Sequence, residues 1–142
     1  MMVRLFLDTC IVIDLVEGKP EQQSQLKALL FGKRVVSSEL VRMEARLQAV
    51  RDQRDDLLTI YDNYFGGCEL VPFDRALFDH ATRLRIDHRI KTPDALHLAA
   101  ALKSQCDQFW TNDMHLAKAA GTKLEVWDWD RIEKASQRQG QE

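Results

Sequence analysis

The sequence has little of what marks several common classes of protein. It has only three cysteines, an odd number without C-x-x-C spacing, which argues against both a disulfide framework and a zinc site. No apolar run approaches the roughly 20 residues of a membrane span. Asp8 and Asp14 also interrupt any signal-peptide core near the start. With 142 residues and no repeat or low-complexity segment, the chain is expected to form one domain. Its few cysteines, without a disulfide pattern, favour a reducing cytosol.

An excess of positive charge is also missing. Twenty basic residues stand against twenty-two acidic ones, which gives a formal net charge of −2. No global positive field therefore favours a polyanionic partner, so any nucleic acid would have to be bound through a local patch or through metal. The phosphate-binding motifs G-x-x-x-x-G-K-[ST] and G-x-G-x-x-G and the zinc motif H-E-x-x-H are all absent.

What the chain does contain is a regular alternation of short apolar runs and helical patterns. The runs expected to form strands are residues 3–7, 34–36, 69–73, 108–110 and 124–129. Strands that alternate with helices predict an α/β fold, a three-layer domain whose central, mainly parallel sheet is flanked by helices. This domain is expected to cover residues 1–130. Residues 131–142 are polar and are expected to form a frayed C-terminal tail.

One segment begins a helix with an acid in its first turn. Thr92 is a suitable N-cap, Pro93 suits the first helical position, and Asp94 follows directly. The Ala- and Leu-rich run after Asp94 is too apolar for a surface helix and predicts burial on most sides. By itself, Asp94 is explained equally well as a carboxylate that complements the helix dipole.

Three further acids are expected near Asp94. Asp8 and Asp113 each follow a predicted strand, and in α/β folds the site lies outside the carboxyl ends of the strands. Glu44 is placed on the inward side of a helix capped by Ser37 or Ser38, whose apolar positions are Leu40, Met43, Leu47 and Val50. The alternative for Glu44 is a carboxylate that extends from the helix edge to solvent.

Four carboxylates in one crevice would repel one another, so a cluster without a cation is a poor structural choice. Oxygen ligands suit Mg²⁺ or Mn²⁺, and such ions can activate a water for in-line attack on a phosphodiester. Thr9 and Thr111, each beside an acid, are candidates to hold a carboxylate or a metal-bound water. The sequence Asp8-Thr9-Cys10 lacks the second aspartate of an aspartyl-phosphate phosphatase, which favours a nuclease.

A basic stretch leads into Asp94. Arg85, Arg89 and Lys91 are candidates to bind RNA phosphates, with an ordinary solvated face as the alternative.

Together these residues resemble a PIN-domain ribonuclease, specifically the toxin of a VapBC-type toxin–antitoxin pair. The matching segments are residues 7–15, Ser38 with Glu44, residues 92–99 and residues 111–113. The resemblance implies Mg²⁺- or Mn²⁺-dependent RNA cleavage, frequent homodimerisation, and inhibition by a cognate antitoxin. The cysteine usage, and not the resemblance, predicts a cytoplasmic protein. The resemblance assigns Asp8, Glu44, Asp94 and Asp113 to the acidic metal-binding and catalytic quartet, with Thr9 and Thr111 as supporting hydroxyls.

Two positions depart from the family pattern. Cys10 stands where the family often has Ser, and Leu116 stands where some members have a further acid, which leaves the number of metal ions open. A PIN-like binding module without turnover and a metal-dependent phosphatase are the alternative functions. An antitoxin segment is expected in an apolar groove beside the helices that carry two apolar stripes, Leu26, Leu29 and Leu30 on one and Tyr61, Tyr64 and Phe65 on the other. An Arg or Lys of that segment would reach the acidic crevice.

Overall fold

A parallel sheet forms the centre of the molecule. The computed structural model describes residues 2–140, and within them the strands are β1 (Arg4–Leu7), β2 (Arg34–Ser37), β3 (Glu69–Leu70), β4 (Gln108–Trp110) and β5 (Glu125–Trp127). They lie in the order β3-β2-β1-β4-β5, and every neighbouring pair is parallel. The predicted α/β fold is therefore confirmed.

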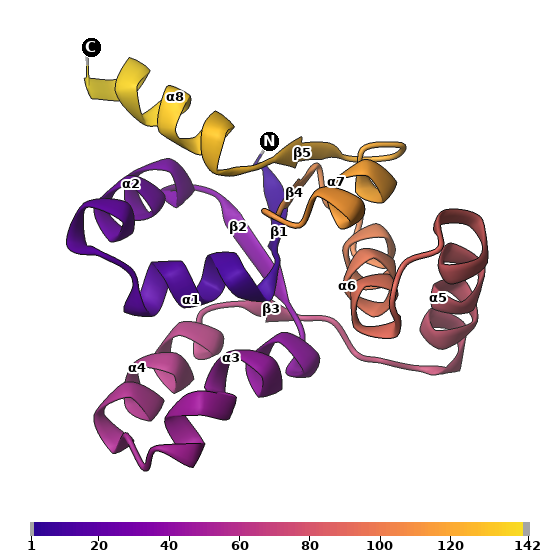
Figure 1. The fold of residues 1–142 in the computed structure, drawn as a ribbon, viewed down its shortest axis with the longest axis horizontal. Coiled ribbons are helices and arrows are strands. Elements are labelled where there is room, and N and C mark those ends of the chain that lie inside the picture. The colour runs from indigo at the N-terminus through magenta and orange to yellow at the C-terminus, as the bar shows by residue number, and fades with distance from the viewer. Residues whose placement is uncertain (1, 141–142) are drawn as a thin grey trace.

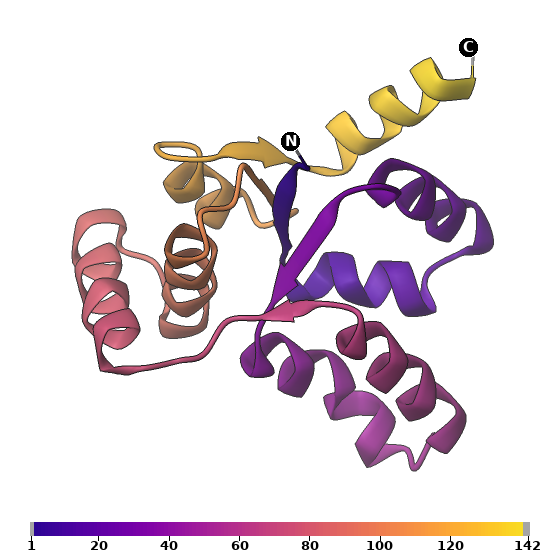
Figure 2. The ribbon, with the colours of Figure 1, turned by 180° about the vertical axis from the view of Figure 1, so that it is seen from behind.

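Helices cover both faces of this sheet. They are α1 (Thr9–Glu17), α2 (Pro20–Leu30), α3 (Glu39–Arg51), α4 (Asp55–Gly66), α5 (Arg75–His88), α6 (Thr92–Lys103), α7 (Met114–Ala120) and α8 (Trp129–Gly140). In both views α1, α2 and the α3–α4 pair lie on one side of the strands, and α5, α6 and α7 lie on the other (Figures 1 and 2). No helix within residues 2–140 is long and apolar enough to cross a membrane.

The central strand β1 sets the position of the polar residues that follow it. Leu5, Phe6 and Leu7 are fully buried, and Phe6 stacks on Phe109 of β4 with ring centroids 5.4 Å apart. Because the strands are parallel, the residues after β1, β2 and β4 emerge at one edge of the sheet. The chain leaves β1 at Asp8, which confirms the predicted place of that acid.

Helix α6 is the buried helix that the sequence predicted. Seven consecutive residues, Ala95 to Ala101, are buried. Its start differs by one residue from the prediction: Lys91, not Thr92, is the N-cap, and no side chain caps the helix. The Thr92 hydroxyl instead accepts a hydrogen bond from Nη1 of Arg85 at 3.0 Å, which ties the end of α5 to the start of α6.

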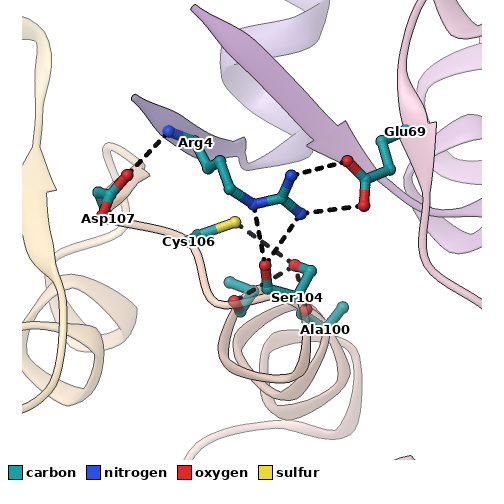
Figure 3. Close-up of polar contacts among 7 residues, drawn as sticks. Arg4, Glu69, Ala100, Ser104, Cys106 and Asp107 are labelled. Carbon is teal, nitrogen blue, oxygen red and sulfur yellow. Dashed lines mark hydrogen bonds and ion pairs between the residues drawn. The ribbon is translucent and has the colours of Figure 1, made fainter. Parts of the chain in front are cut away.

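At the opposite edge of the sheet, Arg4 joins three elements (Figure 3). Its two terminal nitrogens donate to the two carboxylate oxygens of Glu69 in β3, each at 2.9 Å. Nε and Nη2 also donate to the carbonyl oxygen of Ser104, the C-cap of α6, at 3.1 and 2.9 Å. A guanidinium matches this set of acceptors because its donors form a planar fork.

We expect Arg4→Lys to lower the free energy of unfolding by about 1–2 kcal/mol, because an ammonium cannot make the paired contacts and the site is only partly exposed. Urea denaturation measures the effect. Arg54→Lys is the matched control, since Arg54 pairs with Asp56 at an exposed position and should leave the urea midpoint unchanged. Equal urea midpoints for Arg4→Lys and wild type would contradict the role given to Arg4.

The predicted inner face of α3 is correct for Leu40, which packs against the core, and for Glu44, but it is wrong for the other three apolar positions. Its buried residues are Val41, Ala45 and Ala49, whereas Met43, Leu47 and Val50 are each more than half exposed. Both sets follow helical spacing, so periodicity alone could not separate them. The small side chains face inward because α3 packs closely against both α1 and α4.

The C-terminal end also differs from the prediction. The last strand ends at Trp127, and Trp129 begins α8, so this strand is shorter than the predicted residues 124–129. Residues 131–142 were expected to form a frayed tail; residues 131–140 are helical, and residues 141–142 lie outside the described residues. Ile132 is fully buried, and Trp129 and Ala135 pack against the core, so a short apolar stripe holds α8 in place.

The third strand is also shorter than the predicted residues 69–73, since β3 contains only Glu69 and Leu70.

Candidate active site

Asp8 is held at the carboxyl end of β1 from two sides. The hydroxyl of Thr111, which follows β4, donates to Asp8 Oδ2 at 2.7 Å, and the Thr9 amide donates to Oδ1 at 2.8 Å. The residue is only 8% exposed and caps the N-terminus of α1. The Cys10 thiol lies 3.9 Å from Asp8 Oδ2, and desolvation of the sulfur together with the Asp8 charge raises the pKa of Cys10 to about 11. Asp8 thus faces neutral donors only, and its orientation is fixed.

Glu44 is held through one of its two carboxylate oxygens. The Thr9 hydroxyl and Nε2 of His97 both contact Glu44 Oε1, each at 2.7 Å. Because a carboxylate only accepts, the His97 ring donates from Nε2. Desolvation would raise the pKa of Glu44, but the hydrogen bonds from His97 and Thr9 outweigh it, so the pKa is lowered. Glu44 is therefore a fixed anion whose second oxygen makes no hydrogen bond to the described residues.

Asp94 and Asp113 share a cleft of about 210 Å³, here called the acidic cleft. Its lining residues are Arg89, Ile90, Lys91, Asp94, Asp113 and His115. Asp113 Oδ1 accepts from the Leu116 amide at 3.0 Å and so caps α7, and the Asp113 amide donates to the Thr111 hydroxyl at 3.1 Å. Asp94 lies in the first turn of α6, as predicted.

The charges of the other three acids reach Asp94 and contribute to a raised pKa of its carboxyl group. Desolvation raises this pKa most, and the charges of Asp113 and Asp8 raise it further; His97 opposes them, and Glu44 makes the smallest contribution to the rise. Asp8 and Glu44 do not line the acidic cleft, but their charges still act on Asp94. The structure therefore brings all four predicted acids to one region of negative potential.

The donor set fits a hard divalent cation. Within residues 2–140, no three His, Cys, Asp or Glu side chains come close enough to form a ready-made metal cage. Mg²⁺ does not require one, since it keeps several waters and is usually held through one or two carboxylates. Asp94, whose pKa is raised by desolvation and then by the neighbouring carboxylates, belongs to the kind of ligand set that such an ion stabilises.

Two more clefts adjoin the acidic cleft. The basic cleft, about 510 Å³, is lined by Thr82, Arg85, Ile86, Arg89, Ile90 and Lys91. The histidine cleft, about 340 Å³, is lined by Asp87, His88, Arg89, His115, Lys118, Ala119 and Thr122. All three candidate RNA-binding residues, Arg85, Arg89 and Lys91, line the basic cleft, and two of them also line the acidic cleft.

A separate apolar groove of about 620 Å³ lies between α1, α2 and α4. Its lining residues are Leu15, Val16, Gln23, Lys27, Leu30, Phe31, Val35, Ile60, Asn63 and Tyr64. Of the two apolar stripes predicted for this region, only Leu30 and Tyr64 line the groove. The other four residues, Leu26, Leu29, Tyr61 and Phe65, are at most 4% exposed and belong to the core. Phe31 is 88% exposed and was not predicted.

Sequence reasoning also missed two histidines of the site. His97 is 1% exposed and lies three residues after Asp94 in an otherwise apolar helix. That isolated polar residue on the face of Asp94 was the signal for it. His115 follows Asp113 by two residues and lines both the acidic and the histidine clefts.

Comparison with known proteins agrees with this geometry. The family model described as "PIN domain" matches residues 5–122. No curated protein sequence gives a significant match to the chain.

Several solved structures share the fold at low sequence identity. VapBC2 from Rickettsia felis, bound to a DNA fragment from its promoter, has a TM-score of 0.70 and 17% identity, over 90% of this chain and 100% of that one. DNA-bound VapBC from Salmonella typhimurium has a TM-score of 0.70 and 18% identity, over 90% and 99%. A toxin–antitoxin complex from Klebsiella pneumoniae has a TM-score of 0.62 and 21% identity, over 77% and 86%.

Proposed function

The chain belongs to the PIN domain family, and from this premise we propose that it is a Mg²⁺- or Mn²⁺-dependent endoribonuclease that acts as the toxin of a toxin–antitoxin pair. The observation that carries the proposal is the geometry of the acids: the Thr111 hydroxyl links Asp8 to the Asp113 amide, Thr9 links Asp8 to Glu44, and Asp94 and Asp113 line one cleft. A protein that only binds a partner has no need to hold four acids at one edge of its sheet against their repulsion.

Asp8, Glu44, Asp94 and Asp113 would hold the cation. When bound, it would supply positive charge at the scissile phosphate and lower the pKa of a water, so that the water could lose a proton and attack the phosphorus in line. The protein's own contribution is to hold the acidic side chains in position before the cation and the substrate bind. Thr111 and the Thr9 amide orient Asp8, and the Thr9 hydroxyl with His97 orients Glu44. Such partners limit the reorganisation that substrate binding would otherwise require.

His97 gives a separable test of this arrangement. We expect His97→Leu to reduce cleavage by about 10–100-fold, because Glu44 Oε1 loses a donor. We expect His97→Gln, which can donate from a similar position, to keep most of the activity. Leucine should not harm the fold, since Nδ1 of His97 is buried and makes no hydrogen bond to the described residues. Steady-state kinetics and a melting curve of both variants measure the two effects, and equal loss in both would contradict positioning by the Nε2 donor.

The apolar groove is the proposed site for an antitoxin segment. It offers aliphatic and aromatic side chains beside α2 and α4, as an amphipathic segment requires. The three similar structures named above were each solved as complexes of VapBC or toxin–antitoxin type. An Arg or Lys of the segment would pair with the site's carboxylates. Homodimerisation and a cytoplasmic location also remain proposals, and the three free thiols fit a reducing compartment.

One assay separates this function from its alternatives. Purified protein is incubated with single-stranded RNA, single-stranded DNA and a chromogenic phosphomonoester, each with Mg²⁺, with Mn²⁺ and with chelator. The proposal predicts internal cleavage of RNA that depends on metal. Turnover of the monoester alone would indicate a phosphatase, and no turnover of any substrate would indicate a binding module.

A further inference from the structure

Arg89 lines three clefts at once. It lines the basic, acidic and histidine clefts. The acidic cleft, with Asp94 and Asp113, therefore shares Arg89 with each of the other two clefts. Lys91 lines the basic and acidic clefts, and His115 lines the acidic and histidine clefts. The three clefts therefore form one track, and Asp94 and Asp113 lie in its middle part.

The loop that carries Arg89 and Lys91 is fixed from within. Ile90, between them, is only 3% exposed. Arg85 donates from Nε to the Ile90 carbonyl oxygen at 3.1 Å and from Nη1 to the Thr92 hydroxyl at 3.0 Å. Arg85 thus uses these donors for hydrogen bonds within the protein. Arg89 and Lys91, which flank the buried Ile90, are exposed.

Arg89 also has an unfavourable backbone. With φ 55° and ψ 39°, it caps α5 in the left-handed conformation, where glycine or asparagine is usual. A long side chain at this position costs stability, so the fold alone does not favour arginine there.

The charges of the loop are free to bind a ligand. Within residues 2–140, neither Arg89 nor Lys91 has a carboxylate within 4.0 Å, although acids outnumber bases in the chain. Seven of the twenty Lys and Arg side chains form ion pairs within residues 2–140, so what distinguishes Arg89 and Lys91 is that they stay unpaired while lining the cleft of Asp94 and Asp113. A rigid loop with two unpaired cations beside a carboxylate cleft matches a phosphate of a polyanionic chain.

We propose that the loop Arg89–Lys91 is the phosphate clamp of an RNA track that crosses all three clefts, and that Arg89 binds a phosphate next to the one that is cut. This inference rests on the proposed ribonuclease function. A single RNA strand fits the track because an endonuclease must hold nucleotides on both sides of the cut. The exposed Ile86 in the basic cleft offers apolar surface to a ribose or base.

RNA binding without cleavage tests the clamp. A fluorescent single-stranded RNA of about 12 nucleotides is titrated in chelator at several salt concentrations. We expect Arg89→Asn, which tolerates the left-handed backbone, to weaken binding by about 10-fold and to lower the salt slope by about one. Arg83→Asn is the control, because it removes the same charge from an exposed position of α5 that lines none of the three clefts, and it should bind like wild type.

A second pair of variants separates binding from folding. Arg89→Gly should raise the melting temperature by about 2–4 °C, because it removes the backbone strain, and yet bind RNA as weakly as Arg89→Asn. Gln53→Gly is its control, since Gln53 has φ 53° on the exposed turn after α3. Gln53→Gly should gain similar stability and keep full RNA binding.

The outcomes distinguish the clamp from the proposed function. If wild type cuts RNA with metal and Arg89→Asn has the same RNA affinity, salt slope and KM, the clamp is wrong and the nuclease stands. If wild-type binding is too weak to measure in chelator, a raised KM with unchanged kcat for Arg89→Asn supports the clamp, and an unchanged KM overturns it. If wild type neither binds nor cuts RNA, the proposed function fails and the clamp fails with it.

Discussion

Asp94→Asn is expected to reduce RNA cleavage on the order of 10²–10³-fold while the protein stays folded. Asparagine keeps the size of Asp94 in the first turn of α6, but it removes one of the four charges that would hold the cation. Initial rates with labelled single-stranded RNA measure the loss. Asp79→Asn is the control, because Asp79 is exposed on α5 away from the site, and it should cleave like wild type. Near wild-type turnover of Asp94→Asn, with an unchanged metal requirement, would remove Asp94 from the site.

The same variant should be more stable than wild type when metal is absent. The pKa of Asp94 is raised above 3.8 by desolvation and by its acidic neighbours, so its ionised form opposes folding. This penalty is fully present above the folded pKa and disappears as the pH falls below the unfolded value of 3.8. Melting curves of the two metal-free proteins should therefore differ at neutral pH and converge in acid. A difference that does not change with pH would contradict the electrostatic explanation.

The second large effect is expected in the apolar groove. Phe31→Asp combined with Ile60→Asp should weaken antitoxin binding by about 10²–10³-fold, because buried aromatic and aliphatic anchors dominate such interfaces. Both side chains are at least half exposed, so the fold should tolerate the change. Growth gives a direct readout: co-expression of the cognate antitoxin should rescue cells that make wild type but not cells that make the double variant.

Two controls make this result interpretable. Phe78→Asp changes an exposed phenylalanine of α5 that does not line the groove, and rescue should be unaffected. Adding Asp94→Asn to the double variant should remove its toxicity, which shows that growth inhibition comes from the carboxylate site. Full rescue of the groove variant by antitoxin would place the partner elsewhere.

The sequence predicted the parts that depend on chain order and on strand ends. Short apolar runs alternate with helices, and this alternation is enough to predict a parallel sheet. Asp8 and Thr111 follow neighbouring strands, so their 2.7 Å hydrogen bond is a consequence of that order. The place of these polar residues was predictable for the same reason, because the carboxyl edge of the sheet collects the residues that follow the strands.

The sequence could not predict features that depend on which of two helix faces is buried. On α3, the large stripe of Met43, Leu47 and Val50 carries more apolar surface than Val41, Ala45 and Ala49, yet the smaller set is buried. The small side chains are buried because they let the helices pack closely, and the local sequence pattern does not indicate which face does so. The same limit explains why the lining of the apolar groove was mostly mispredicted: four of the six residues expected beside it are buried in the core.

Polar partners formed across long sequence separations were equally hidden. The bond of His97 to Glu44 spans 53 positions, and the bond of the Trp129 indole to Asp14 spans 115. The latter helps to hold the start of α8, the helix whose residues from 131 onward were expected to form a frayed tail. Only the folded chain shows that these side chains meet, because each looks like an ordinary core or surface residue in sequence.

Direct measurement of Mn²⁺ binding tests the central claim, that Asp8, Glu44, Asp94 and Asp113 form one divalent-cation site. Electron paramagnetic resonance of free Mn²⁺ gives the affinity of wild type and of each single Asp→Asn or Glu→Gln variant without reference to RNA. The account predicts saturable binding by wild type, at least about 10-fold weaker binding by each of the four variants, and wild-type affinity for Asp79→Asn. Equal Mn²⁺ affinity in wild type and all four variants would contradict it.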